Sequence, residues 1–345
     1  MDSNVSKNTN SHNFFKLRFN QEKLGISVKN LLKQELLLIL DLYQQEFNVQ
    51  IEPTLLSNIQ STKIAIFQPK NSPTSIRNSS SLSPGQFLSI VYACPLGMSL
   101  GTNLQQSPPA IMKQIGDLMS KLTLKTHQTD KEFSGQSERL RRGTTELPLT
   151  SLITEVVPLG WCNFYLDSQF MADWLGRSLY WSQNNVINDH NSDSLEATLD
   201  QLFPPQYIHA RCCSLLDLGA RENLITLSNN AQQIEQPASI SWLDPEQQLW
   251  LREVAERDLL QQLLITSDSW VESANVHNPL KHWSKLALSL SQKTAIFLAN
   301  CRFLGEVKQR YPQKAIARLG LIALVQFWLE KILVEKLRVI APREL

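Results

Sequence analysis

Residues 205–218, PQYIHARCCSLLDL, open the half of the chain that decides the fold. The pattern from here to residue 339 is almost entirely helical. Further helices are expected over 244–266, 279–303 and 311–339. Asp244, followed by Pro245, has the form of an N-cap with a proline in the first turn. Apolar side chains then recur at helical spacing, as at Ala255, Leu259 and Leu263. These features predict a helix bundle.

The N-terminal half mixes helical and extended patterns. A helix is expected over 28–47, because its leucines and isoleucines recur three and four residues apart. The other expected elements are a strand at 63–67, an apolar run at 87–94 that fits either a strand or a helix, a helix at 110–121, one or two strands within 152–166, and a helix capped by Asp167 or Ser168 that runs to residue 179. The half is therefore predicted to be an α+β domain, and the chain as a whole to be mainly α-helical.

Polar segments suggest how these halves are divided. Residues 182–194, SQNNVINDHNSDS, form a polar linker at a shift in composition. We expect a disordered lead at 1–22, an α+β domain at 23–181, a linker at 182–204 and a helix bundle at 205–345.

Bulk properties exclude several classes of protein. The chain has 345 residues and a net charge of +1, which argues against a uniformly basic nucleic-acid arm or an acidic disordered chain. No apolar stretch approaches the roughly 20 residues that span a bilayer. The five cysteines form no C-x-x-C pair and the histidines do not join them at ligand spacing, so no metal site, no cofactor and a cytoplasmic location are predicted.

The near-neutral net charge hides a split within the helical half. Residues 221–280 carry nine acidic and three basic side chains, whereas residues 281–345 carry twelve basic and four acidic ones. A basic face of this kind could neutralise phosphates. It could equally be a solvated surface that pairs with the acidic segment beside it.

Two strings are more specific, namely QYIHARCCSL at 206–215 and RVIAPREL at 338–345. They resemble two segments of arginyl-tRNA synthetases, Q-Y-A-H-A-R-I-x-S-I, which opens the anticodon-binding helix bundle (the DALR domain), and L-G-I-x-A-P-E-R-M at the chain end. NCRFLG at 300–305 is similar to the Y-x-x-C-x-V-L turn of that bundle. The resemblance runs through residues 205–345 in order and spacing.

A weaker resemblance covers residues 155–175, EVVPLGWCNFYLDSQFMADWL, which are similar to the end of the N-terminal additional domain of the same family. In that family a catalytic Rossmann domain with H-I-G-H and K-M-S-K motifs separates the two modules. Neither motif occurs here, and residues 181–204 are too few for a doubly wound sheet, in which each βαβ unit takes roughly 30 residues. The chain therefore looks like a synthetase without its catalytic domain.

The resemblance implies a set of RNA contacts. Tyr207 would stack on an anticodon-loop base and Arg211 would meet a phosphate or a base edge; the alternative is a core tyrosine and an internal ion pair. His209 is expected to be structural. The basic segment makes Lys308, Arg310, Lys314 and Arg318 the first candidates for phosphate contacts, with Lys281, Lys285 and Lys293 next. The resemblance implies a D-loop contact for Asn163 and Tyr165 and an apolar contact near the anticodon for Leu345.

The sequence thus predicts a non-catalytic tRNA-binding paralogue of arginyl-tRNA synthetase, with tRNA-Arg as the first candidate and a protein partner left open. Similarity alone would label it an arginine–tRNA ligase. One alternative is a protein-interaction scaffold that has lost RNA binding. Another is a subunit that completes an arginine–tRNA ligase in trans.

Overall fold

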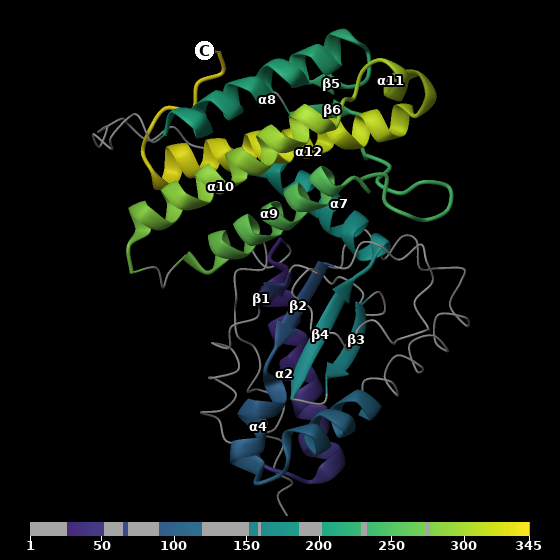
Figure 1. The fold of residues 1–345 in the computed structure, drawn as a ribbon, viewed down its shortest axis with the longest axis vertical. Coiled ribbons are helices and arrows are strands. Elements are labelled where there is room, and N and C mark those ends of the chain that lie inside the picture. The colour runs from purple at the N-terminus through teal and green to yellow at the C-terminus, as the bar shows by residue number, and fades with distance from the viewer. Residues whose placement is uncertain are drawn as a thin grey trace, which may run out of the picture.

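The computed structural model of the chain describes residues 26–51, 65–67, 90–118, 152–157, 160–185, 202–228, 233–273 and 277–344. They form an α+β part, at the bottom of Figure 1, and a helical part at the top. The predicted fold class is confirmed. The lead at 1–22 and residues 186–201 of the linker lie outside the described residues, so these two assignments stay predictions.

Helix α2, Val28–Phe47, has the bounds that its apolar spacing predicted. Ser27 caps it by accepting a hydrogen bond from the Asn30 N–H at 3.2 Å. Asn48 ends it in the left-handed conformation, with φ 49°. The periodic apolar face is buried in one core with side chains of the sheet.

The described strands of the α+β part form an antiparallel sheet in the order β1-β2-β4-β3. Their bounds are β1 Ala65–Phe67, β2 Ile90–Cys94, β3 Leu152–Val157 and β4 Trp161–Leu166. The apolar run left open at 87–94 is thus a strand, and β2 is buried along its whole length. Strand β4 alternates between buried and half-buried residues. Helix α4, Leu96–Leu104, and helical residues 108–118 lie at the end of the sheet away from the bundle (Figure 1).

Helix α7, Ser168–Asn184, joins the two parts. Asp167 caps it, accepting a hydrogen bond from the Phe170 N–H at 2.7 Å, and the helix runs past the predicted end at 179. The Trp174 indole donates to the Ile26 carbonyl at 2.9 Å on the α+β side. Near its other end Trp181 stacks on Trp328 of the bundle, with ring centroids 5.5 Å apart. The α+β part and the bundle are therefore in direct contact through this helix.

The bundle is built around one buried helix, α12, Pro312–Lys331. Its other helical elements are α8 Phe203–Arg221, α9 Val254–Val271, α10 Pro279–Asn300, α11 Glu306–Arg310 and the π-helical turn η6 Ile332–Lys336. A short hairpin, β5 Thr226–Leu227 and β6 Ile234–Gln236, follows α8. Helices α8 and α12 approach closely at Gly219, where a Cβ would lie 2.8 Å from Leu319.

One predicted helix start is wrong. Helix α9 begins at Val254 and not at residue 244. The Asp244 carboxylate accepts the Gln248 N–H at 2.8 Å and pairs with Arg252, so it closes a turn instead of capping a helix. The real start is a capping box, in which the Glu253 and Glu256 side chains each accept a backbone N–H of the other residue.

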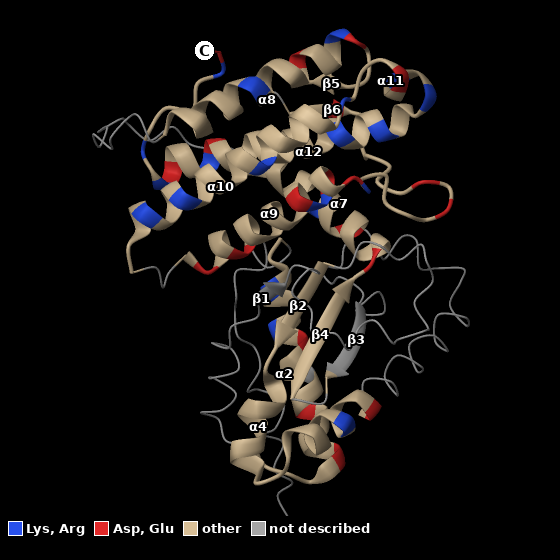
Figure 2. Ribbon diagram, viewed as in Figure 1, with Lys and Arg blue, Asp and Glu red and all other residues tan. Residues whose placement is uncertain are grey.

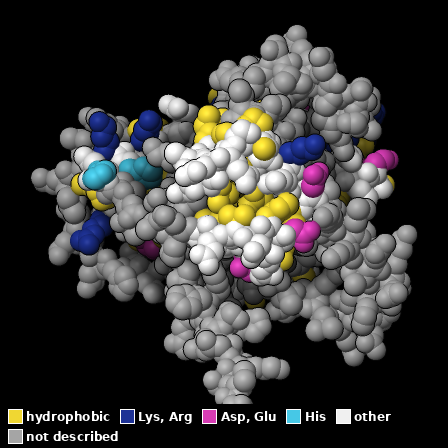
Figure 3. Space-filling view, turned by 90° about the horizontal axis from the view of Figure 1, so that it is seen from below, with side chains coloured by type: hydrophobic (Ala, Val, Ile, Leu, Met, Phe, Trp, Pro, Cys, Tyr) yellow, Lys and Arg dark blue, Asp and Glu magenta, His cyan; other side chains and the backbone are white. Residues whose placement is uncertain are grey.

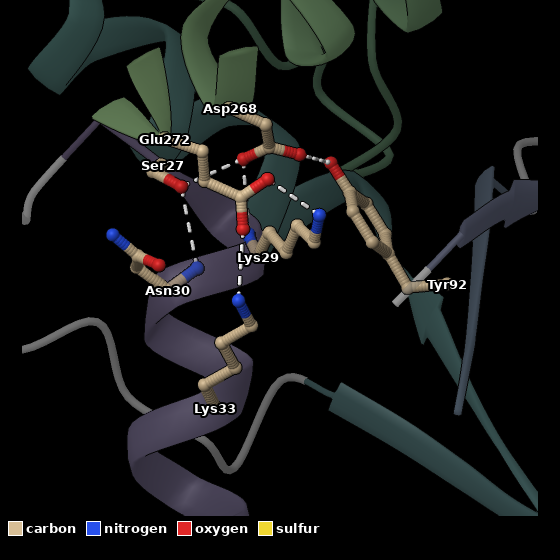
Figure 4. A network of polar contacts seen from close by, with 7 residues as sticks. All are labelled: Ser27, Lys29, Asn30, Lys33, Tyr92, Asp268 and Glu272. Atoms are coloured by element: carbon tan, nitrogen blue, oxygen red, sulfur yellow. Dashed lines mark hydrogen bonds and ion pairs between the residues drawn. The ribbon is translucent and has the colours of Figure 1, made fainter. Parts of the chain in front are cut away.

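A buried polar network also ties the two parts together (Figure 4). Asp268 of α9 accepts hydrogen bonds from the Ser27 hydroxyl at 2.8 Å, the Lys29 N–H at 3.0 Å and the Tyr92 hydroxyl at 2.8 Å. Burial raises the pKa of the Asp268 carboxyl to about 6, against the opposing effect of these donors. One carboxylate of the bundle is thus held by three groups of the α+β part.

Glu272, one turn further along α9, makes the more exposed part of the same contact. Its carboxylate pairs with the Lys29 amine at 2.6 Å and the Lys33 amine at 2.8 Å. Burial alone would raise the pKa of Glu272, but the hydrogen bonds from the two lysines outweigh it and the pKa is lowered. The carboxylate therefore stays charged, and the two parts share an ion pair beside the buried hydrogen bonds.

Among the helices of the described residues, none has the length and apolar character needed to cross a membrane.

Candidate nucleic-acid interface

Helix α8 presents two aromatic rings and a cation to solvent on one face. Phe203, Tyr207 and Arg211 follow one another at intervals of four residues, which places them on the same side of a helix. Phe203 is 57% exposed and Tyr207 is 49% exposed, and their rings stack with centroids 6.2 Å apart and an interplanar angle of 24°. Arg211 is exposed and forms no ion pair with any residue that the structure describes. Tyr207 is therefore not a core residue, and Arg211 does not form the alternative internal ion pair with any described residue.

The segment 338–344 returns over the start of α8 and completes this surface. The Gln206 side-chain amide donates to the Ile340 carbonyl at 2.8 Å, and the His209 ring lies 2.7 Å from the Pro342 carbonyl. The side chain of Ile340 is 75% exposed. Arg338 and Arg343 on the same segment are also exposed. We call Phe203, Tyr207 and Arg211 together with residues 338–344 the α8–tail surface.

His209 holds this segment from inside the protein. Its side chain is fully buried, and burial lowers its pKa although the contact with Pro342 acts in the opposite direction. A neutral ring that donates from Nδ1 to the Pro342 carbonyl accepts at Nε2, where the Gln326 amide nitrogen lies 3.2 Å away. The structural role predicted for His209 is confirmed.

The predicted phosphate contacts of α11 and α12 lie at the other end of the bundle from the point where the chain reaches its C-terminal segment (Figure 2). Lys308 pairs with Glu222 at 2.7 Å, Arg310 with Glu306 at 2.8 Å and Lys314 with Glu253 at 3.5 Å. These side chains are partly or well exposed. Because a carboxylate already offsets each charge, they attract an anion less than an unpaired cation does.

The structure contradicts the phosphate contact predicted for Arg318. Its side chain is 5% exposed and that of Glu256 is fully buried, and the two pair at 2.7 Å. Arg318 also donates to the Arg302 carbonyl. A side chain enclosed in this way cannot reach a phosphate outside the bundle, so Arg318 belongs to the core and not to an RNA contact.

Asn163 and Tyr165 lie on β4 of the α+β part, away from α8 (Figure 1). Both are half-buried and alternate with the buried Cys162, Phe164 and Leu166. Their D-loop contact stays a prediction. Leu345 lies outside the described residues, as does the contact predicted for it.

The sequence prediction did not include Phe203, Arg338, Ile340 or Arg343 among the contacts of this surface. The signal for Phe203 was present, because it precedes Tyr207 by one helical turn. Ile340 had no such signal, since its position beside α8 depends on the hydrogen bonds of a distant segment.

The described residues hold no group of three or more His, Cys, Asp and Glu that could bind a metal ion. The five cysteines are buried and unpaired, and burial raises their thiol pKa values. Such thiols are poor nucleophiles and poor metal ligands.

Comparisons with known proteins agree with the resemblance seen in the strings. Residues 205–337 match the DALR anticodon binding domain. A stretch of 193 residues, 55% of this chain, is 27% identical to an arginine–tRNA ligase of Gloeobacter violaceus, and the chain covers 28% of that ligase. The comparison with solved structures found no match. The chain thus carries a DALR anticodon-binding domain in its C-terminal part and resembles a portion of an arginyl-tRNA synthetase.

Proposed function

We propose that the chain is a non-catalytic tRNA-binding protein that holds an anticodon loop on the α8–tail surface. The observation that carries the proposal is the pair of exposed, stacked rings of Phe203 and Tyr207 next to the exposed Arg211, which makes no ion pair with a described residue. Aromatic rings at a surface stack on unpaired bases, and a nearby guanidinium can meet a phosphate or stack as well. The match of residues 205–337 to an anticodon-binding domain supports this function.

The proposal that the chain is non-catalytic rests on the domain that it matches and on the sequence motifs that it lacks. The matched family covers residues 205–337, and the sequence holds no H-I-G-H or K-M-S-K motif for ATP. Contact between α7 and both parts supports a chain whose two modules pack on each other. Amino-acid activation is tested by ATP–pyrophosphate exchange with arginine, where a rate above the buffer control would contradict this part.

RNA binding is tested by titrating labelled tRNA-Arg into the full chain at low and moderate salt. Tyr207→Ala is expected to weaken binding by about 1–3 kcal/mol if one base stacks on the ring. Tyr311→Ala is the matched control, because Tyr311 is 51% exposed but stands at the start of α12 at the opposite end of the bundle. Equal losses for both variants, or no binding by the unaltered chain at low salt, would overturn the proposal.

The D-loop contact of Asn163 and Tyr165 is a second part of the proposal. Asn163→Ala should weaken the binding of full-length tRNA. It should leave the binding of the isolated anticodon stem–loop unchanged, because that fragment lacks the D-loop. A loss for both RNAs would contradict the assignment.

A further inference from the structure

Helix α10 carries two lysines in its first turns and no acidic residue of its own. Residues 273–305 contain no Asp or Glu, although the stretch is mostly a surface helix. Lys293 in its middle pairs with Asp258 of α9 at 2.7 Å. Lys281 and Lys285 are exposed and form no ion pair with any described residue. A solvated helix ordinarily mixes both signs of charge, so this end of α10 lacks the usual internal compensation.

The two lysines stand on one face, four residues and therefore about 6 Å apart along the helix. His277 and His282 lie beside them in the sequence. In Figure 3 histidine side chains gather with Lys or Arg side chains at one edge of the molecule, away from the apolar and acidic middle of that view. Lys281 and Lys285, both exposed, form a small basic surface at the start of α10.

This surface is connected to the α8–tail surface. Helix α10 packs against η6, and the Lys336 amine of η6 lies 5.2 Å from the Trp283 ring centroid. Arg338 follows with φ 54°, a left-handed residue that turns the chain away from η6 toward α8. Both α8 and α10 also begin at the end of the bundle where the C-terminal segment lies (Figure 1).

We infer that the start of α10, through Lys281 and Lys285, binds the phosphate backbone of the paired stem that adjoins the loop held by the α8–tail surface. The inference rests on the proposed function and decides where the rest of the RNA lies. The stem follows the tail and η6 to α10, and does not cross the bundle to α11 and α12. Lys281 and Lys285 favour this path, because no described carboxylate pairs with them and phosphates would supply the opposite charge.

The test measures the affinity of the full chain for the isolated tRNA-Arg anticodon stem–loop and for its loop as an unpaired strand, each at several salt concentrations. Lys281→Ala/Lys285→Ala should lower the slope of log affinity against log salt for the stem–loop by about 2, since each phosphate-bound lysine contributes about 1. The affinity of this double variant for the unpaired loop should equal that of the unaltered chain. Both lysines are exposed, so the melting temperature should not change.

Lys308→Ala/Arg310→Ala is the matched control, because it removes the same charge from side chains that pair with Glu222 and Glu306. The inference is overturned if the α10 variant keeps the slope of the unaltered chain, or if the control variant lowers the slope as much. It is also overturned if the α10 variant loses affinity for the unpaired loop as much as for the stem–loop. When Tyr207→Ala weakens binding but the α10 variant does not, only this inference fails. When the unaltered chain does not bind tRNA at all, the proposed function fails.

Discussion

Arg318→Met should destabilise the bundle strongly, although arginine substitutions at a protein surface do little. The Arg318 Nε lies 2.7 Å from Glu256 Oε1, with the two side chains 5% and 0% exposed. Glu256 also accepts the Glu253 N–H at 2.8 Å, so it cannot swing out to water without breaking the capping box. The variant would therefore leave a carboxylate buried and unpaired.

The expected loss follows from that burial. Breaking a buried ion pair by removing one partner costs about 3–5 kcal/mol. In urea unfolding, with a slope of about 3 kcal/mol per M or more for a chain of this size, this lowers the midpoint by about 1 M. Arg310→Met is the control, because its pair with Glu306 is 70% exposed and such pairs contribute less than about 1 kcal/mol.

The double variant Arg318→Met/Glu256→Gln should recover most of the loss. Glutamine keeps an oxygen for the Glu253 N–H but carries no charge. The assay is urea unfolding followed by tryptophan fluorescence, with tRNA binding measured on the same samples. An Arg318→Met variant that unfolds at the same urea concentration as the unaltered chain but no longer binds tRNA would refute the buried assignment.

Three further predictions concern the network, the packing and the tail. Because the pKa of Asp268 is raised from 3.8 to about 6, its contribution to stability is present below pH 3.8 and is lost as the pH rises through 6. The unfolding free energy of Asp268→Asn should therefore rise by roughly 2 kcal/mol relative to that of the unaltered chain between pH 4 and pH 7, and a difference that does not change with pH contradicts this. Gly320→Ala should cost about 1–3 kcal/mol, because its Cβ would lie 2.5 Å from the Trp242 ring; an unchanged melting temperature contradicts it. His209→Ala should release the tail, seen as faster hydrogen exchange of the Val339 amide, which is bonded to the Leu333 carbonyl at 2.9 Å; protection equal to that of the unaltered chain would show that the tail is held without His209.

Local patterns predicted the elements whose signals lie within a few residues. Helix α2 keeps its predicted bounds because its apolar period and its Ser27 cap agree. The start of α9 was misplaced because Asp244 has the residue type of a cap, but its carboxylate meets Gln248 and Arg252 instead. Asp and Pro in sequence cannot distinguish a helix start from a turn when both use the same side-chain acceptor.

Some residues of the candidate site were also predicted from local sequence, whereas the role of others depends on distant segments. Tyr207 and Arg211 were found from their string, and helical spacing alone puts them on one face. Arg318 and Lys308 look alike in sequence, yet one is enclosed with Glu256 and the other reaches solvent. Whether a cation is buried in an ion pair or exposed depends on the carboxylates of other helices. Neither composition nor spacing shows where those carboxylates lie.

The sequence by itself determined the mainly helical bundle, the α+β part before it and the two strings that resemble an anticodon-binding domain. These depend on periodicity, caps and residue identity, which are local properties of the chain. Only the tertiary structure decided that 338–344 lies over α8, that Asp268 joins the two parts, and that no described carboxylate pairs with Lys281 or Lys285. Those facts depend on which distant side chains meet, because burial and charge compensation arise only when separate segments pack together.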